Sequence, residues 1–300
     1  MTAVEPETVR ETLPFLKGHG TLNDFVILPD DRADLDLDDV LVRALCDRRA
    51  GIGADGVLRI ALAGALVDRG VLDAMPDGVT ATDWFMDYRN ADGSIGEMCG
   101  NGVRVFAHAL RATGRVAASF VPVGTRSGPR PAEFLSHDGD EALVRVSMGE
   151  PRLLGVSSVE WGGQRYAGLA VDMGNPHLAC VVPGLDAAGL AKLPIRENPD
   201  VDRAFFPRGV NVEIATPLDA GRVWMRVHER GVGETMSCGT GIVATAVAAL
   251  ADAGETSGEV TVSVPGGDVR VRLSDRGSSL AGPSVLVADG HFRLARAQPS

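Results

Sequence analysis

Two cysteines begin the same short phrase at distant points of the chain. Cys99 begins Cys-Gly-Asn-Gly and Cys238 begins Cys-Gly-Thr-Gly, and each phrase leads into an Ala- and Val-rich stretch that stops at a glycine, Gly114 or Gly254. A glycine directly after such a stretch is a typical helix stop. The pattern predicts an internal repeat in which each half delivers one thiol to a helix N-terminus.

A thiol at a helix N-terminus has a distinct chemistry. The first amide N–H groups of a helix are unpaired and carry partial positive charge, so they bind a carboxylate and lower a thiol pKa from about 8.5 toward neutrality. Two such ends that face each other could hold an acid between a thiolate, which removes the proton from the α-carbon, and a thiol, which returns one to the opposite face. We expect this pair to share one proton at rest and to titrate as a unit.

This arrangement favours racemisation or epimerisation next to a carboxylate. Amide donors aimed at the developing charge are typically worth about 2.7–4 kcal/mol each. The expected donors are the first residues of the two helices, which are Gly100, Asn101, Gly239 and Thr240.

Composition limits the class of protein. The chain has 300 residues, 45% of them apolar, and a formal net charge of −11. The length predicts two domains, and the negative charge argues against nucleic acid or an anionic membrane as partner. The N-terminal segment lacks the basic and apolar regions of a secretion signal, and no run approaches the roughly 18 apolar residues of a membrane span. We therefore expect a cytoplasmic enzyme that acts on a small molecule.

The four cysteines have no local CxxC spacing, which argues against a disulfide framework and against a metal site. Cys46 lies in an amphipathic helical segment that Asp38 could cap, and Cys180 lies in the strand-like LACVV. Both are expected to be small buried apolar residues rather than reactive groups.

The elements that must position the thiols follow an α/β pattern. A strand, a turn and an apolar helix occur once in each half, with a connection over residues 61–82 and mostly strands in the second half. Pro265 to Asp268 separate two alternating runs and predict a hairpin, and residues 284–294 predict a last strand. The boundary between the halves is expected near Ser147.

Six segments, in family order along the chain, resemble the diaminopimelate epimerases. They are LNDF at 22–25, NADGS at 90–94, MCGNG at 98–102, MGNPH at 173–177, VNVE at 210–213 and ERGVGETMSCGTG at 229–241.

The resemblance implies two pseudo-symmetric domains, each a mixed β-sheet curled around a central α-helix, with the active site in the cleft between them. Residues 1–147, completed by 283–300, would form the first domain, and residues 148–282 the second. The implied activity is cofactor-independent interconversion of LL- and meso-diaminopimelate, a diamino dicarboxylate of lysine and peptidoglycan-precursor biosynthesis.

The resemblance also assigns roles to single residues. Cys99 and Cys238 would be the acid/base pair, His177 and Glu229 would tune it, and Arg230 would hold the distal carboxylate by its bidentate fork. Glu229 could also meet an ammonium group. The asparagines, whose amides both donate and accept, would bind the substrate; they are Asn23, Asn90, Asn175 and Asn211.

Two positions depart from some members. Gly56 stands where certain relatives have a glutamine, so that side-chain contact is missing or made otherwise. Ala288 stands where some have an aromatic residue that supports dimer pairing, which weakens the homodimer that the resemblance implies.

Three alternatives stay open. A proline or hydroxyproline racemase would resemble Cys-Gly-His at the first thiol, where this chain has Asn101, and would lack Arg230 and the set of asparagines. A racemase for another amino acid could keep both thiols and change only the distal contacts. In a different class, the thiols could serve as a redox switch or bind a soft metal in a sensor. The glycines before the helices lack the full pattern of a nucleotide-binding loop, so no cofactor is expected.

Overall fold

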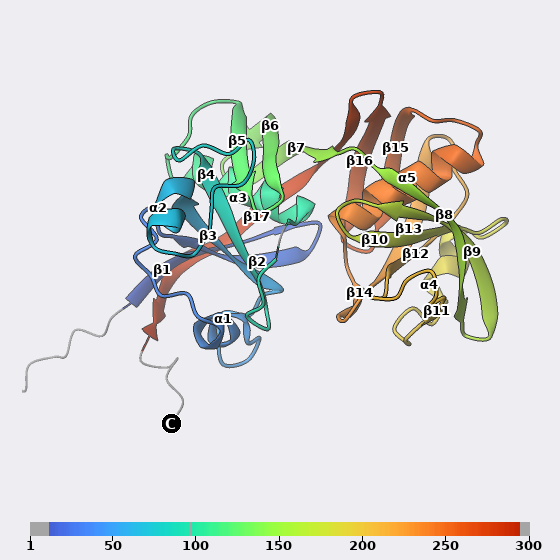
Figure 1. The fold of residues 1–300 in the computed structure, drawn as a ribbon, viewed down its shortest axis with the longest axis horizontal. Coiled ribbons are helices and arrows are strands. Elements are labelled where there is room, and N and C mark those ends of the chain that lie inside the picture. The colour runs from blue at the N-terminus through green and yellow to red at the C-terminus, as the bar shows by residue number, and fades with distance from the viewer. Residues whose placement is uncertain (1–11, 97, 295–300) are drawn as a thin grey trace, which may run out of the picture.

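The computed structural model describes residues 12–96 and 98–294 and has two sheet-rich lobes side by side (Figure 1). The expected mixed α/β chain is confirmed. Residues 1–11 and 295–300, at the outer ends of the segments assigned to the first domain, lie outside the described residues.

The first lobe holds most of the N-terminal half. Its β1 and β2 are antiparallel, β2 and β3 are parallel, and β5, β6 and β7 form an antiparallel meander. Its elements are β1 (Thr12–Gly20), β2 (Asn23–Pro29), α1 (Asp39–Cys46), β3 (Gly56–Leu62), α2 (Ala63–Asp68), β4 (Trp84–Asn90), α3 (Gly100–Ala112), β5 (Phe120–Thr125), β6 (Gly128–Asp138) and β7 (Glu141–Gly149).

The second lobe contains the next eleven elements. Strand β13 lies between β12, which is antiparallel to it, and β15, which is parallel to it. The elements are β8 (Arg152–Trp161), β9 (Gln164–Asp172), β10 (Pro176–Val181), α4 (Ala187–Ala191), β11 (Asp200–Val201), β12 (Asn211–Ala215), β13 (Arg222–Glu229), β14 (Gly233–Thr235), α5 (Gly239–Asp252), β15 (Gly258–Val264) and β16 (Gly267–Ser274).

The final strand, β17 (Gly277–Arg293), runs from the second lobe into the first (Figure 1). Its beginning pairs with β16, its middle with β7 and its end with β1, all antiparallel. Thr12 therefore lies opposite Arg293, and the two ends of the described chain belong to one sheet.

Strands pack around both α3 and α5. Helix α3 contacts β1 to β7 and β17, and α5 contacts strands β9, β10, β12, β13 and β15 to β17. One apolar cluster contains Val103 and Phe106 of α3, Ile242 of α5 and Met148 between them. Because this core is continuous across the lobes, it fixes the two helices relative to each other.

Several expected elements are confirmed. The helices that follow the two cysteines end before Gly114 and Gly254, whose φ values of 73° and 78° are in the left-handed region that glycine tolerates. Asp38 caps α1 by accepting the Leu41 N–H at 2.7 Å. Pro265 lies in the turn between β15 and β16, as the hairpin prediction requires.

Two expectations were wrong in extent. The connection over residues 61–82 contains the short helix α2, which begins without a side-chain cap and so has no start signal in the sequence. The last strand begins at Gly277 rather than at 284, because the turn after β16 returns the chain directly into the sheet.

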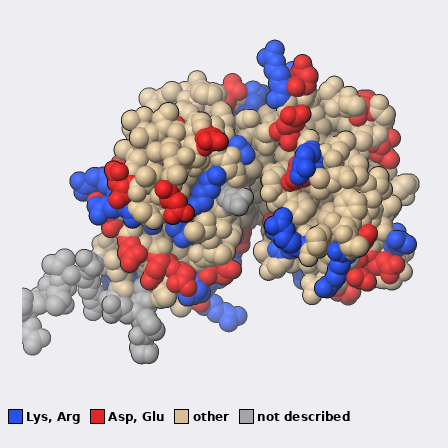
Figure 2. Space-filling view, in the orientation of Figure 1, with Lys and Arg blue, Asp and Glu red and all other residues tan. Residues whose placement is uncertain are grey.

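Acidic and basic side chains are interspersed over both lobes on the face in Figure 2, which is hollowed between the lobes. Within the described part of the chain, no helix is both long and apolar enough to cross a membrane.

Candidate active site

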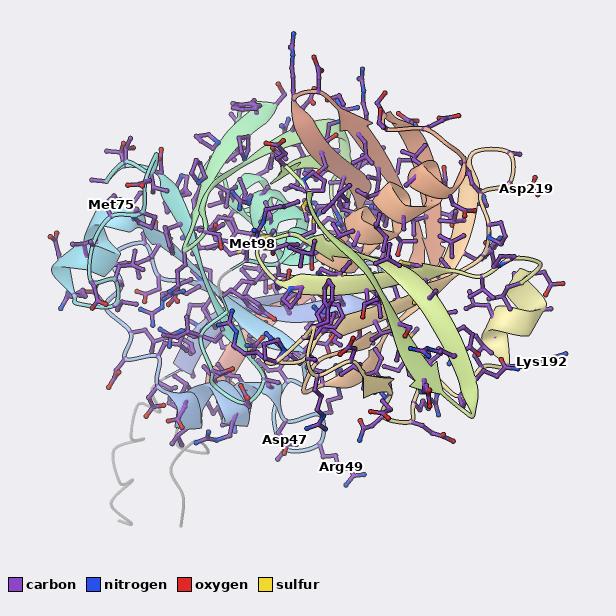
Figure 3. The ribbon with its side chains drawn as sticks, turned by 45° about the vertical axis from the view of Figure 1, so that its right-hand side comes forward. Asp47, Arg49, Met75, Met98, Lys192 and Asp219 are labelled. Atoms are coloured by element: carbon purple, nitrogen blue, oxygen red, sulfur yellow. The ribbon has the colours of Figure 1, made fainter. Side chains whose placement is uncertain are left out.

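The two repeated phrases meet at the junction of the lobes. Cys99 is the N-cap of α3 and Cys238 is the N-cap of α5, and both have the extended backbone of that position. A Cβ placed on Gly239 would lie 3.2 Å from the Cα of Gly100 and 3.4 Å from the amide nitrogen of Asn101. Glycine at position 239 therefore lets the two helix ends abut, as the repeat predicts. Met98 lies at this junction (Figure 3).

The first thiol has both donors and acceptors around it. The Gly102 N–H donates to the Cys99 Sγ at 3.4 Å, and the sulfur lies 3.6 Å from the Asn23 Oδ1, to which its S–H can donate. The Asn101 side chain donates to the same oxygen at 3.3 Å. Asn23 is thus in contact with the first thiol.

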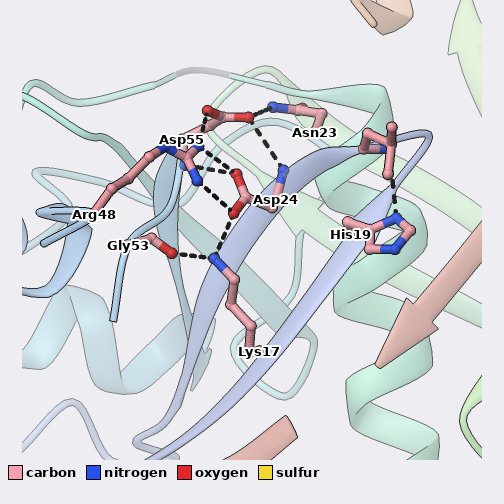
Figure 4. Close-up of polar contacts among 8 residues, drawn as sticks. Lys17, His19, Asn23, Asp24, Arg48, Gly53 and Asp55 are labelled. Atoms are coloured by element: carbon pink, nitrogen blue, oxygen red, sulfur yellow. Dashed lines mark hydrogen bonds and ion pairs between the residues drawn. The ribbon is translucent and has the colours of Figure 1, made fainter. Parts of the chain in front are cut away.

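A carboxylate sets the orientation of the Asn23 amide. The Asn23 Nδ2 donates to the Asp55 Oδ2 at 2.9 Å (Figure 4). This bond leaves the Asn23 Oδ1 to face Cys99. Arg48 donates to Asp55 at 2.7 Å and to Asp24 at 2.8 Å. Asp55 therefore fixes which end of the amide the thiol meets.

Asp24 anchors this group of charges. Lys17 donates to it at 2.6 Å and also to the Gly53 carbonyl (Figure 4). Burial acts to raise the pKa of Asp24, but the hydrogen bonds from Arg48 and Lys17 outweigh it and hold that pKa well below its ordinary value. Burial raises the pKa of Asp55, against the hydrogen bond from Asn23.

The second thiol has an acidic setting. The Cys238 Sγ lies 3.5 Å from the Thr240 hydroxyl, and the nearby charged groups are the carboxyls of Glu229 and Glu213. A Cβ on Gly241 would overlap the Glu213 carboxyl, so this glycine lets that group reach the first turn of α5. Both carboxyls oppose ionisation of Cys238.

The expectation that the helix ends lower both thiol pKa values is wrong. Burial raises the pKa of Cys99 to about 11, although the Gly102 N–H acts in the opposite direction. Burial, reinforced by Glu229 and Glu213, raises the pKa of Cys238 further, well above its ordinary value. The cost of removing a thiolate from water outweighs the helix ends.

The hydrogen bonds of His177 go to Glu213 and Asn175 rather than to the second thiol. Its Nδ1 lies 2.7 Å from the Glu213 Oε1 and its Nε2 lies 3.1 Å from the Asn175 Oδ1. His177 and Glu213 are fully buried. His177 therefore reaches the site through Glu213.

Buried polar side chains tie the two lobes together beside the thiols. The Asn101 Nδ2 donates to the Ser237 carbonyl and hydroxyl oxygens, each at 3.2 Å. The Thr21 hydroxyl donates to the Ser237 Oγ at 2.8 Å. A Cβ on Gly266 would overlap the Thr21 carbonyl, so the turn between β1 and β2 fits closely against the second lobe.

The remaining expected residues make local contacts. The Asn211 Oδ1 accepts the Arg230 N–H at 2.9 Å, and the exposed Arg230 guanidinium donates to the Arg208 carbonyl at 3.0 Å. Glu229 accepts from the Thr235 hydroxyl at 2.6 Å, and burial raises its pKa. Asn90 donates to Ser94 at 2.9 Å.

The other two cysteines are buried, as expected. Burial raises the pKa of both Cys46 and Cys180 to about 12. Cys46 packs in an apolar cluster with Leu41 and Leu45 of α1, and Cys180 packs in another with Leu178 and Val212, both separate from the cluster that contains Cys238.

Sequence reasoning missed several residues that border the thiols. Four of them lie within or close to a quoted segment and Asp55 directly precedes Gly56, but nothing local shows where these side chains point. They are Thr21, Asp55, Arg104, Glu213 and Ser237.

Comparison with known proteins places this chain in a family. The family model described as diaminopimelate epimerase matches residues 15–154 and 169–291. A diaminopimelate epimerase of Rhodococcus opacus is 57% identical over 280 residues, covering 93% of this chain and 97% of its own length. One of Mycobacterium tuberculosis is 58% identical over 276 residues, covering 92% and 96%.

A likeness between folds extends further than these sequences. The structure of a hydroxyproline epimerase from Agrobacterium vitis matches with a TM-score of 0.63 at 14% identity, covering 94% of this chain and 93% of that one. At that identity the likeness concerns the fold alone. The model match and the identity to curated relatives over nearly the whole chain show that it belongs to the diaminopimelate epimerase family.

Proposed function

We propose that the chain interconverts LL- and meso-diaminopimelate through two thiols, without a cofactor, in lysine and peptidoglycan-precursor biosynthesis. The observation that carries the proposal is the meeting of two helix N-termini, each capped by a cysteine, at Gly100 and Gly239. Family membership supports the choice of substrate.

The first amides of α3 and α5 would hold the carboxylate next to the reacting carbon. Amides at these positions have no partner within the helix, and the two helix dipoles add in one place. The donors would be Gly100, Asn101, Gly239 and Thr240. As the α-proton leaves, negative charge moves onto the carboxylate and these donors stabilise it.

The two thiols would then exchange one proton each with the substrate. One thiolate takes the α-proton, and the opposite thiol gives its proton to the other face, so that the pair is left with the same proton count in reversed places. Burial opposes a thiolate in both positions, and the α-ammonium of the substrate supplies positive charge where it is needed. His177, through Glu213, and Glu229 would set the charge around Cys238.

The distal end of the substrate would be read by polar side chains of both lobes. Arg230 presents an exposed guanidinium suited to a second carboxylate, and its backbone is held by Asn211. The side-chain amides of Asn23, Asn90 and Asn175 would also bind the substrate. A proline racemase would have no use for this distal arginine.

We place this site in a cleft between two domains, each with its sheet curled around α3 or α5. The first domain would be residues 1–147 with 283–300, and the second 148–282. We expect the protein to act in the cytoplasm as a homodimer. Ala288 weakens the dimer part of this expectation, because some relatives have at this position an aromatic residue that supports dimer pairing.

The test is incubation of the pure protein with LL-diaminopimelate in D2O, without added cofactor, followed by analysis of stereochemistry and label. A two-thiol mechanism predicts meso product that carries deuterium at the inverted carbon, with little label in the remaining substrate at early times. Equal labelling of substrate and product would indicate a single base, and equal turnover of proline would overturn the substrate assignment.

A further inference from the structure

A buried arginine lies on the same helix as the first thiol. Arg104 is 0% exposed, and its Nε donates to the Pro283 carbonyl at 3.2 Å. Its Nη2 donates to the Thr21 hydroxyl at 3.3 Å, and its Nη1 has no partner. No carboxylate among the described residues forms an ion pair with it. A buried cation without a counter-ion is costly, so the position requires an explanation.

Glycines make room for this guanidinium near the start of α3. A Cβ on Gly20 would lie 2.9 Å from the Arg104 Nη2 and 3.2 Å from the Asn101 carbonyl oxygen, and one on Gly282 would lie 3.3 Å from the Arg104 Cζ. Side chains on a helix lean toward its N-terminus, which directs Arg104 to the turn that Cys99 caps. The glycines on β1 and β17 thus leave the space that the guanidinium of Arg104 fills.

The charged groups around Arg104 are few. Burial lowers its pKa to about 10, so it stays protonated at neutral pH, and the group that opposes this lowering is Cys99. Cys99 also faces Glu229 on β13, and Tyr88 on β4, whose own pKa burial holds far above neutrality. Arg104 is therefore the positive charge that the first thiol meets.

The second thiol has no equivalent cation in its surroundings among the described residues. Cys238 meets Glu229 on β13 and Glu213 on β12, and His177 on β10 lies behind Glu213. Position 243 is a valine, at the same spacing from its cysteine as Arg104 is from Cys99. The repeat thus carries a buried charge on one side only.

We propose that Arg104 is a positioning residue that makes Cys99 the first of the two thiols to ionise and leaves Cys238 as the one that keeps its proton. The proposal depends on the two-thiol chemistry proposed above. Once ionised, Cys99 takes the α-proton and Cys238 gives its own to the opposite face. The charge then lies on Cys238, and exchange with solvent or the reverse reaction restores the Cys99 thiolate.

The test measures the pH midpoint of alkylation of each cysteine by iodoacetamide, followed by peptide mass spectrometry on the folded protein. A midpoint reports ionisation, whereas access alone changes the rate at every pH. We expect Cys99 to have the lower midpoint. Arg104→Met, which removes the charge and keeps the length, should raise it by about one pH unit or more, as loss of a nearby opposite charge does.

Two further variants separate charge from packing. Arg104→Lys keeps the charge and should hold the Cys99 midpoint near that of the parent. Arg111→Met makes the same charge change on the outer part of α3, where Arg111 stacks 4.9 Å from the Phe134 ring centroid, and should shift neither midpoint.

Two results would overturn the proposal: a lower midpoint for Cys238 in the parent protein, or an unchanged Cys99 midpoint in folded Arg104→Met. The first result decides the matter even if Arg104→Met does not fold. Because alkylation needs no substrate, a parent that shows these midpoints but does not epimerise diaminopimelate would refute the proposed function and leave the role of Arg104 standing.

Discussion

The N-termini of α3 and α5 have the same backbone but different surroundings. Each begins at a cysteine N-cap followed by Gly-X-Gly, and each is packed among strands. Around Cys99 lie an amide oxygen, a buried guanidinium and the Glu229 carboxyl, whereas Glu229 and a second carboxyl, that of Glu213, border Cys238. Duplication has preserved the shape of the site and not its charges. Two copies of one motif can therefore form an active site for a reaction that needs one acid and one base, provided that their surroundings differ in charge.

Removal of either thiol tests the shared part of the comparison and should have the largest effect. Cys99→Ala and Cys238→Ala should each lower kcat by about 10²–10⁴-fold, because each supplies one proton transfer. Cys46→Ala and Cys180→Ala should leave turnover per folded molecule unchanged, since both side chains are buried in apolar clusters separate from the one that contains Cys238. Full activity in Cys99→Ala or Cys238→Ala would mean that the repeated phrases only begin two helices and have no catalytic role.

Substitution of Arg230 tests a contact that only the second lobe provides. Arg230→Lys loses the bidentate fork, and a hydrogen bond to a charged group is worth about 1.5–3 kcal/mol, so kcat/KM for diaminopimelate should fall about 10–100-fold. Steady-state kinetics with LL-diaminopimelate measures this. An unchanged kcat/KM would place the distal carboxylate elsewhere.

The two glycines that follow the thiols should tolerate a methyl group unequally. A Cβ on Gly239 meets the backbone of α3, whereas one on Gly100 lies 2.8 Å from the flexible end of Met148. Gly239→Ala should therefore cost about 1–3 kcal/mol of unfolding free energy, the usual range for overpacking, and Gly100→Ala should cost less. Chemical denaturation of both variants measures the difference, and the reverse order would contradict the abutting helix ends.

Removal of a charge from the group formed by Lys17, Asp24 and Arg48 should have the smallest effect. This group lies behind Asn23, on the side of the first thiol, and the quantity affected is the unfolding free energy. The folded state lowers the pKa of Asp24, so its charge stabilises the fold above the ordinary pKa of about 3.9, and this contribution is lost as the pH falls. Asp24→Asn should lower the unfolding free energy by about 1 kcal/mol at pH 7, because Arg48 is largely exposed.

The difference in unfolding free energy between Asp24→Asn and the parent protein should become smaller below about pH 3.9. Urea unfolding at pH 7 and pH 3 measures it, with Asp68→Asn as the exposed control on α2. A difference that widened in acid would mean that the Asp24 charge is unfavourable in the fold.

The parts of the site that the sequence predicts are those with local signals. Cysteine N-caps, glycine stops and the Asp38 cap are read within a few residues, and the structure has each of them. Helix α2 was missed because it is six residues long and its N-cap, Leu62, makes no side-chain hydrogen bond to it.

Contacts between residues far apart in the chain could not be predicted from such local signals. Glu213 and Arg104 lie in or beside recognised segments, yet their opposite effects on the two thiols depend on which strands pack against α3 and α5. The thiol pKa values failed as predictions for the same reason, because burial is a property of the assembled lobes and not of a helix end.

The path of β17 has a consequence for the order of folding. Residues 278–293 supply the partner for both β7 and β1, so the sheet of the first lobe stays incomplete until residue 293 has been synthesised. Pairing of Thr12 with Arg293 requires closure of a loop that contains almost the whole described part of the chain, and such non-local contacts slow folding. The same adjacency suits the described part of the chain to circular permutation, since a short linker could join Arg293 to Thr12 and the chain could be opened in an exposed turn.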